Sequence, residues 1–293
     1  MAHGSTIDSE RRPGGLVERA LTVFLTGAEC PFTCSFCDLW RWTLDGPTPA
    51  GALPTQVRRV LETLEKPMPD RLKLYNASNF FDPRAVPPQD LPALAELASP
   101  FVAVTVESHA NLIGGPVLTF SARIPGRLEV AVGLETIHPV AAAHLNKRMD
   151  LSRFDADAGF LMMHQIDLRV FVLVGAPYVP PEESLEWTVR TVEHAAQKCE
   201  AAAISLIPVR GGNGELERLA ALGHFAPPSL RQLETALDHC IGLGGRSTAV
   251  AADLWDVDRL PACTECGPSR IERLRRMNLT GHSEPPVTCS DCD

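Results

Sequence analysis

The chain has 293 residues, of which 45% are hydrophobic and 22% are charged, and its formal net charge is −9 at pH 7. This composition is typical of a globular protein that can bury a large core and form one α/β barrel. No apolar run reaches the length of a membrane span, and the polar first residues lack the apolar core of a secretion signal. Nucleic-acid binding depends on neutralising phosphates, so the acidic balance argues against general nucleic-acid binding. We expect a cytoplasmic protein with no membrane partner.

Apolar runs typical of strands alternate with segments typical of helices along most of the chain. Residues 1–18 are polar and are expected to form a flexible lead. Strands that alternate with helices indicate βαβ units and a parallel sheet. The expected strands are 21–25, 71–75, 101–106, 128–134, 168–174 and 202–207, with a further candidate at 249–253. The expected helices are 55–66, 91–98, 114–122, 139–146, 152–164, 182–197, 215–222 and 229–242.

Six βα units predict a partial (β/α)6, TIM-like barrel over residues 19–210. Residues 211–293 are then expected to form a helical extension. Active sites of such barrels lie at the carboxyl-terminal ends of the strands. We therefore expect functional side chains directly after the strands.

Three cysteines lie close together after the first expected strand. They are Cys30, Cys34 and Cys37, in the spacing C-x3-C-x2-C. Iron–sulfur clusters are usually held by four Cys thiolates, so three on one loop suggest a cubic cluster with one iron open to a small molecule. The alternative is a zinc loop with a fourth ligand from elsewhere, but structural zinc sites more often use C-x2-C pairs.

A second group of cysteines lies near the end of the chain. Cys263 and Cys266 form one C-x2-C pair, and Cys289 and Cys292 form another. Four Cys in two such pairs are a strong metal signal. Zinc would make them a structural clamp, whereas four thiolates can equally hold an auxiliary [4Fe–4S] cluster. The short local spacing favours zinc, and both alternatives stay open.

Polar residues stand at several of the expected strand ends. A single polar residue there is often only a turn residue or a helix cap. Two carboxylates at the mouth of one barrel are harder to explain in this way. We expect Glu107, Glu135 and Arg210 to be catalytic candidates, and Asn76, Ser78, Glu135 and Ser205 to be cofactor-binding candidates.

A cluster of arginines follows the first tail pair. Arg270, Arg273, Arg275 and Arg276 lie within one helical segment. They could contact phosphate, but we expect a solvated helix face.

The three-Cys loop, with the aromatic Phe36 before its third Cys, resembles that of the radical S-adenosylmethionine (SAM) superfamily. The chain is similar to the branch that includes the radical domain of the Elongator catalytic subunit, the tRNA methylthiotransferases and, most similar, the archaeosine-synthesis radical SAM proteins. This resemblance implies an α/β fold, a radical SAM barrel with a small Cys-rich metal-binding extension. The matching stretches are 75–82, 104–108, 133–139, 145–147 and the pair Cys263/Cys266.

The resemblance also implies a chemistry. Cys30, Cys34 and Cys37 would hold a [4Fe–4S] cluster whose open iron binds SAM. Reductive cleavage would give a 5′-deoxyadenosyl radical that abstracts hydrogen from the substrate, in modification, sulfur insertion or lyase chemistry. By the same resemblance, Glu135 contacts SAM or substrate, and the loop with Asn76 and Ser78 lines the SAM pocket. Phe36 is a further cofactor-binding candidate by this resemblance.

The expected partners are a small-molecule or macromolecule-bound substrate and a reductant such as a flavodoxin or ferredoxin. Two alternatives stay open. One is a tRNA-modifying enzyme, which the acidic charge does not favour. The other is a non-catalytic zinc or metal-binding interaction protein, against which the intact three-Cys loop argues.

Overall fold

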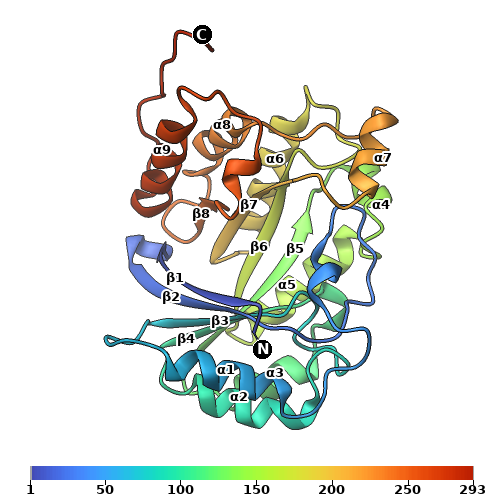
Figure 1. Ribbon diagram of the computed structural model, residues 1–293, viewed down its shortest axis with the longest axis vertical. Coiled ribbons are helices and arrows are strands. Elements are labelled where there is room, and N and C mark those ends of the chain that lie inside the picture. The colour runs from blue at the N-terminus through green and yellow to red at the C-terminus, as the bar shows by residue number, and fades with distance from the viewer. Residues whose placement is uncertain (1, 293) are drawn as a thin grey trace.

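Residues 2–292 are described by a computed structural model, in which eight strands form one sheet in sequence order (Figure 1). β1 is antiparallel to β2, and β2 to β8 are all parallel. Within the described residues β1 and β8 are the two edges of the sheet. The strands are β1 (Gly4–Arg11), β2 (Val17–Phe24), β3 (Arg71–Tyr75), β4 (Ala103–Glu107), β5 (Arg127–Glu135), β6 (Asp167–Val174), β7 (Ala203–Pro208) and β8 (Ala249–Ala252).

Helices connect the parallel strands and pack on the outer face of the curved sheet. Figure 1 shows α1, α2 and α3 together beside β3 and β4. A π-helical turn, His194–Lys198, ends α6. The α-helices are α1 (Ala52–Glu62), α2 (Leu91–Ala98), α3 (Gly115–Ser121), α4 (Pro139–His144), α5 (Leu151–Met163), α6 (Ser184–Glu193), α7 (Glu215–Ala221), α8 (Leu230–Cys240) and α9 (Gly267–Thr280).

The two faces of the sheet differ in chemistry. Successive side chains of a strand point to opposite faces. In β3, Leu72 and Leu74 are completely buried in the apolar core beneath the helices. Arg71, Lys73 and Tyr75 alternate with them and face the barrel interior. The predicted βα barrel is confirmed, and its interior is polar.

The N-terminal segment is not the flexible lead that the sequence predicted. Residues 4–11 form β1, which pairs along its whole length with β2. Glu10 lies between Lys73, at 3.3 Å, and Arg169. Burial alone would raise the pKa of Glu10, but these two cations outweigh it and lower the pKa to about 2. A charged residue therefore occupies an inward position of this strand. For this reason a hydrophobicity pattern does not predict the strand.

The open side of the sheet, between β1 and β8, is covered by α9 (Figure 1). Asn278 on α9 accepts a hydrogen bond from the N–H of Ala252 and donates one to its carbonyl, both at 2.8 Å. At the end of α9, Gly281 lies against the guanidinium of Arg11, where a Cβ would overlap that group. The C-terminal helix therefore joins the two edge strands. No helix in the described part of the chain is long and apolar enough to cross a membrane.

Candidate functional site

The segment 30–37, here called the Cys loop, follows β2 at the carboxyl-terminal end of the parallel strands. Cys30, Cys34 and Cys37 are partly buried and are free of disulfides. The N–H of Cys37 donates to the carbonyl of Cys34 at 3.1 Å. The expected position of these cysteines at the mouth of the barrel agrees with the fold.

Two distant segments hold the backbone of the Cys loop. The N–H of Ser35 donates to the carbonyl of Leu145 at 3.0 Å. The side-chain amide of Asn146 donates to the carbonyl of Thr33 at 2.9 Å, and that of Asn213 donates to Ser35 at 3.0 Å. The three cysteines are thus positioned by long-range hydrogen bonds as well as by local turns.

The Cys loop disfavours free thiolates. Burial raises the pKa of the Cys34 thiol to about 11 and that of Cys37 to about 12, and it raises the pKa of Cys30 as well. The ammonium of Lys147 lowers the pKa of Cys30 and Cys34 but does not outweigh burial. Cysteine binds metals as the thiolate. Metal cations bound at the loop would supply the positive charge that balances the three thiolates.

Two aromatic side chains of the Cys loop contact residues outside it. Phe32 stacks on His109 with ring centroids 3.7 Å apart. The Nδ1 of His109 accepts from the N–H of Asn111, so its Nε2 donates to the carbonyl of Lys147 at 2.9 Å. Burial lowers the pKa of His109 to about 4, so this ring is neutral. The Nζ of Lys147 lies 5.9 Å from the centre of the Phe36 ring.

Glu135 ends β5 with an unusual backbone. Its φ is +68°, and the register of β5 with β6 shifts between Gly133 and Glu135. This turn aims the buried carboxylate at Lys147, 2.5 Å away. A Cβ at Gly133 would overlap the Glu135 carboxylate and meet Lys147 Nζ at 2.6 Å, so a larger residue there would displace this pair. Non-glycine residues with positive φ often mark functional sites.

The loop after β3 contains buried polar atoms without partners. Asn76 is 0% exposed, and neither atom of its side-chain amide has a hydrogen-bond partner among residues 2–292. The hydroxyl of Ser78 is also buried and unpartnered. At the end of β4, burial raises the pKa of Glu107 to about 8, so its carboxyl group is neutral at pH 7. Buried polar groups normally have partners, so this end of the barrel has the character of a ligand site.

The other two predicted site residues are placed apart from the Cys loop contacts. Arg210 follows β7 and donates to Asp253 at 2.9 Å, while its Nε is buried without a partner. Ser205 lies in the middle of β7 and accepts from Arg169 at 3.3 Å. It therefore borders the charged interior below the strand ends.

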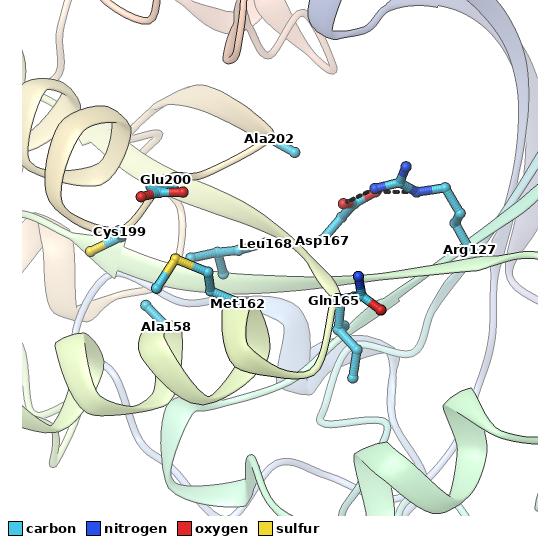
Figure 2. A pocket seen from close by; sticks show the side chains of 10 residues that line it. Arg127, Ala158, Met162, Gln165, Asp167, Leu168, Cys199, Glu200 and Ala202 are labelled. Carbon is cyan, nitrogen blue, oxygen red and sulfur yellow. Dashed lines mark hydrogen bonds and ion pairs between the residues drawn. The ribbon is translucent and has the colours of Figure 1, made fainter.

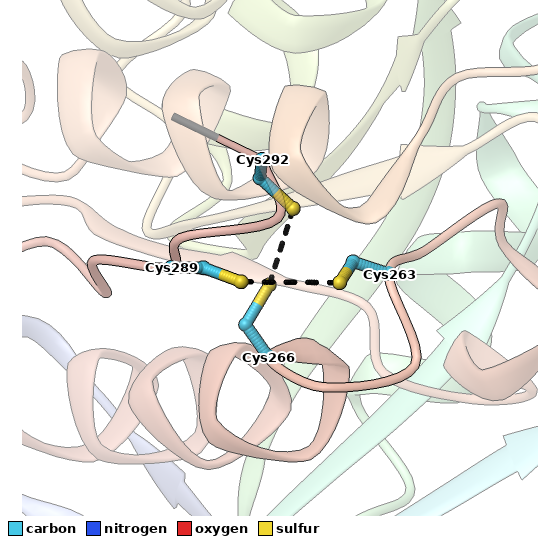
Figure 3. Close-up of side chains that lie close together, drawn as sticks. All are labelled: Cys263, Cys266, Cys289 and Cys292. Atoms are coloured by element: carbon cyan, nitrogen blue, oxygen red, sulfur yellow. Dashed lines mark hydrogen bonds between the residues drawn. The ribbon is translucent and has the colours of Figure 1, made fainter.

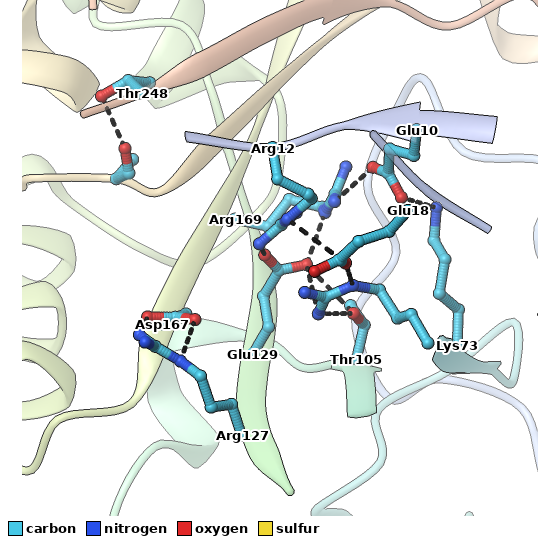
Figure 4. Close-up of polar contacts among 12 residues, drawn as sticks. Glu10, Arg12, Glu18, Lys73, Thr105, Arg127, Glu129, Asp167, Arg169 and Thr248 are labelled. Atoms are coloured by element: carbon cyan, nitrogen blue, oxygen red, sulfur yellow. Dashed lines mark hydrogen bonds and ion pairs between the residues drawn. The ribbon is translucent and has the colours of Figure 1, made fainter. Parts of the chain in front are cut away.

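That charged interior centres on Glu129, which is completely buried (Figure 4). Its two carboxylate oxygens meet Arg12, Arg169 at 2.8 Å and Arg71 at 3.8 Å, and accept from Thr105 at 3.0 Å. Burial alone would raise the pKa of Glu129, but the three guanidinium groups hold it well below its usual range. The interior near the amino-terminal ends of the strands therefore holds paired charges.

The tail cysteines converge on one point (Figure 3). The sulfur atoms of Cys263 and Cys289 are 3.9 Å apart, and those of Cys266 and Cys292 are 3.7 Å apart. All four lie within 4.8 Å of one another. The Nε of Arg270 donates to Cys266 Sγ at 3.2 Å. The predicted metal-binding potential of this group is confirmed.

The expectation of a solvated arginine face on α9 is wrong for its first two members. Arg270 and Arg273 are 5% and 2% exposed. They pair with Glu234, and Arg273 also pairs with Asp238 at 2.8 Å. These charges fasten α9 to α8, so they are not free to bind phosphate.

A pocket of about 290 Å³ lies at the opposite end of the barrel, at the start of β5, β6 and β7 (Figure 2). Arg127 and Asp167 form an ion pair in its wall. Cys199 also lines it and lies within 4.8 Å of the donor atoms of Asp155 and His194. Asp155 already accepts from His194 at 2.6 Å, and Lys198 balances its charge. The strand-end chemistry of a βα barrel does not extend to this side.

Several contacting residues were not among the predicted site residues. The Cys loop or the residues beside it are contacted by Lys147, His109, Asn146 and Asn213. The side-chain amide of Asn79 donates to Cys30 Sγ at 3.2 Å. The run of polar residues after β3 was the only local signal for Asn79.

No protein-family model matches this chain. Archaeosine synthase subunit beta of Methanosarcina acetivorans is 22% identical over 303 residues, which cover 95% of this chain and 84% of that protein. Two solved structures share the fold at 14% identity. They are Elp3 of Methanocaldococcus infernus, with a TM-score of 0.59, and Streptococcus suis SuiB bound to S-adenosylmethionine, with a TM-score of 0.56.

These matches cover 77% and 79% of this chain. The chain spans only 59% of the Elp3 structure and 49% of the SuiB structure. This chain shares a TIM-like barrel with these two structures, so the predicted fold class is confirmed, and the predicted resemblance is supported by the similarity to the archaeosine synthase subunit.

Proposed function

We propose that this chain is a radical SAM enzyme that binds a [4Fe–4S] cluster through Cys30, Cys34 and Cys37. The observation that carries the proposal is the position of three free, partly buried cysteines at the carboxyl-terminal end of the barrel, with thiol pKa values raised by burial. Bound iron would supply the positive charge that stabilises these sulfur atoms as thiolates. Three thiolates leave one iron of a cubic cluster for a further ligand.

When bound, the cluster would supply the electron that cleaves SAM to methionine and a 5′-deoxyadenosyl radical. The protein would bind and orient the cofactor and exclude water. The unpartnered amide of Asn76 and the hydroxyl of Ser78 offer buried donors and acceptors for polar groups of SAM. The Glu135–Lys147 pair would present a fixed carboxylate beside the Cys loop. Glu107, neutral at pH 7, would donate a hydrogen bond rather than repel a carboxylate.

A single zinc ion is our proposal for the tail cysteines. Tetrahedral zinc with Zn–S bonds of about 2.3 Å requires sulfur atoms about 3.8 Å apart. The separations of 3.7 and 3.9 Å agree with this value. In a cubic cluster each thiolate binds a different iron, so the sulfur atoms are held further apart. Sulfur insertion from an auxiliary cluster at the tail is therefore not favoured.

A second candidate is an archaeosine-type modification, favoured by an alignment that covers 95% of this chain and 84% of the curated relative. The net charge of −9 and the internal pairing of Arg270 and Arg273 argue against extended phosphate contacts. A small-molecule or locally recognised substrate fits these charges better. Binding of bulk tRNA that weakens steeply between 50 and 200 mM salt would favour the second candidate.

The test of the main proposal is SAM cleavage. The protein would be reconstituted anaerobically with iron and sulfide, reduced with dithionite and incubated with SAM, and 5′-deoxyadenosine would be measured by mass spectrometry. We expect product from the unaltered protein and from Cys240→Ala, which removes a buried, isolated cysteine of α8. We expect background levels from a variant with Cys30, Cys34 and Cys37 changed to Ala. A reduced, iron-loaded protein that never cleaves SAM would overturn the proposal.

A further inference from the structure

In the described part of the chain, one side-chain hydrogen bond reaches a sulfur atom of the Cys loop. The amide Nδ2 of Asn79 donates to Cys30 Sγ at 3.2 Å. Cys30 also receives the backbone N–H of Phe32. Within residues 2–292, the bonds at Cys34 and Cys37 that lower their thiol pKa come from the backbone. The first cysteine of the loop is therefore distinct in its surroundings.

Asn79 is held rigidly in the position from which it donates. It is only 4% exposed. Its carbonyl accepts from the N–H of Asp82 at 3.1 Å, and the N–H of the next residue, Phe80, donates to the carbonyl of Glu107 at 2.8 Å. Phe80 is completely buried and packs on Phe120. The apolar core thus fixes the loop that carries the amide.

Hydrogen bonds to the sulfur ligands are one of the means by which a protein sets the potential of an iron–sulfur cluster. An N–H that points at a thiolate withdraws electron density from it. Reduction adds negative charge to the cluster, so the same N–H interacts more strongly with the reduced state. The bond from Asn79 therefore favours reduction.

We infer that Asn79 is a positioning residue that raises the reduction potential of the cluster through Cys30, an inference that rests on the proposed function. It makes the one-electron reduction that precedes SAM cleavage easier. It also makes the iron held by Cys30 electronically different from the other two ligated irons.

The chain offers a matched control. Asn213 donates from the same kind of amide to the same loop, but its acceptors are the carbonyls of Ser35 at 3.0 Å and Cys37 at 3.3 Å. Asn79→Leu and Asn213→Leu each remove one amide and keep a side chain of similar volume. Only the first removes a donor from a sulfur atom.

The experiment is an anaerobic redox titration without SAM, in which the reduced cluster is followed by electron paramagnetic resonance. We expect Asn79→Leu to lower the equilibrium constant for reduction about tenfold, equivalent to about 59 mV for one electron. Asn79→Asp, which places an acceptor where the donor stood, should shift the potential in the same direction and further. Asn213→Leu, which frees loop carbonyls but removes no donor from a sulfur atom, should shift the potential by less than Asn79→Leu does.

Equal potentials in unaltered protein and Asn79→Leu, or equal shifts in the Asn79 and Asn213 variants, would overturn the inference. Loss of the cluster from both Asn79 variants would show a role in assembly and would also overturn it. Failure of the unaltered protein to bind iron would instead contradict the proposed function, so the two failures are distinguishable.

Discussion

Glu129 and Asn76 are both completely buried polar residues of one barrel, and their surroundings are opposite. At the amino-terminal end, both oxygens of Glu129 are paired with arginines. At the carboxyl-terminal end, both side-chain atoms of Asn76 lack a partner. The same end holds the positive φ of Glu135 and three thiols with raised pKa values.

The contrast separates polar groups that stabilise the fold from polar groups that await a ligand. Breaking a buried pair leaves an uncompensated charge, which is strongly destabilising. Removing a group that has no partner costs little in the free protein. Stability and ligand binding should therefore respond in opposite ways at the two ends.

The largest effect on stability is expected at the amino-terminal end. Glu129→Ala should lower the free energy of unfolding by about 3 to 5 kcal/mol, because three buried guanidinium groups lose their shared anion. Urea unfolding would measure this. The control is Glu272→Ala, whose exposed pairs with Arg275 at 3.6 Å and Arg276 at 3.7 Å should each contribute less than about 1 kcal/mol. Equal small changes in both variants would break the distinction between the two ends.

Glu107 gives a pH-dependent test at the carboxyl-terminal end. Its folded-state pKa of about 8 lies above the ordinary value of 4.5, so the folded protein holds a proton that the unfolded chain releases. The contribution of Glu107 to the free energy of unfolding is fully present below about pH 4.5. It is lost as the pH rises toward 8. Glu107→Gln cannot titrate, so its stability relative to wild type should rise by about 1 kcal/mol for each pH unit in this range. A difference that stays constant between pH 5 and 8 would contradict the raised pKa.

Gly133→Ala tests the packing around the Glu135–Lys147 pair. The added methyl group would overlap the Glu135 carboxylate, so the pair must move, at a cost of about 1 to 3 kcal/mol. SAM binding should weaken as well. Gly159→Ala on α5 is the control, because open space surrounds that position and alanine favours the helix by up to about 1 kcal/mol. Thermal denaturation should therefore show shifts of opposite sign.

The smallest effect on stability is expected for Asn76→Ala. Since no group of the described residues bonds to this amide, the free energy of unfolding should change by about 1 kcal/mol or less. The dissociation constant for SAM, measured by equilibrium dialysis on iron-loaded protein, should rise about tenfold, as expected for one lost hydrogen bond. A variant that is strongly destabilised yet binds SAM normally would reverse the assignment of this end to ligand binding.

The parts of the fold and site that the sequence predicts correctly are those written in local patterns. Strands β2 to β7 are predicted by apolar runs that alternate with helical segments. The cluster-binding loop is predicted by the spacing of Cys30, Cys34 and Cys37. The tail cysteines are equally local, as two C-x2-C pairs.

The features that the sequence does not reveal depend on contacts between distant segments. β1 escapes detection because its inward residue is the charged Glu10, which is explained only by Arg169 and Lys73. Arg270 and Arg273 look like a solvated face until α8 supplies their partners. Asn79 and Cys30 lie 49 positions apart, so their hydrogen bond has no sequence pattern.

The most direct test of the central claim is a count of iron, sulfide and zinc in anaerobically purified protein, beside the variant with Cys30, Cys34 and Cys37 changed to Ala. We expect about four irons and one zinc per chain, with the iron lost and the zinc retained in the variant. About eight irons, half of them surviving in the variant, would place a second cluster on the tail cysteines. An absence of iron even after reconstitution would contradict the assignment of the Cys loop as a cluster site.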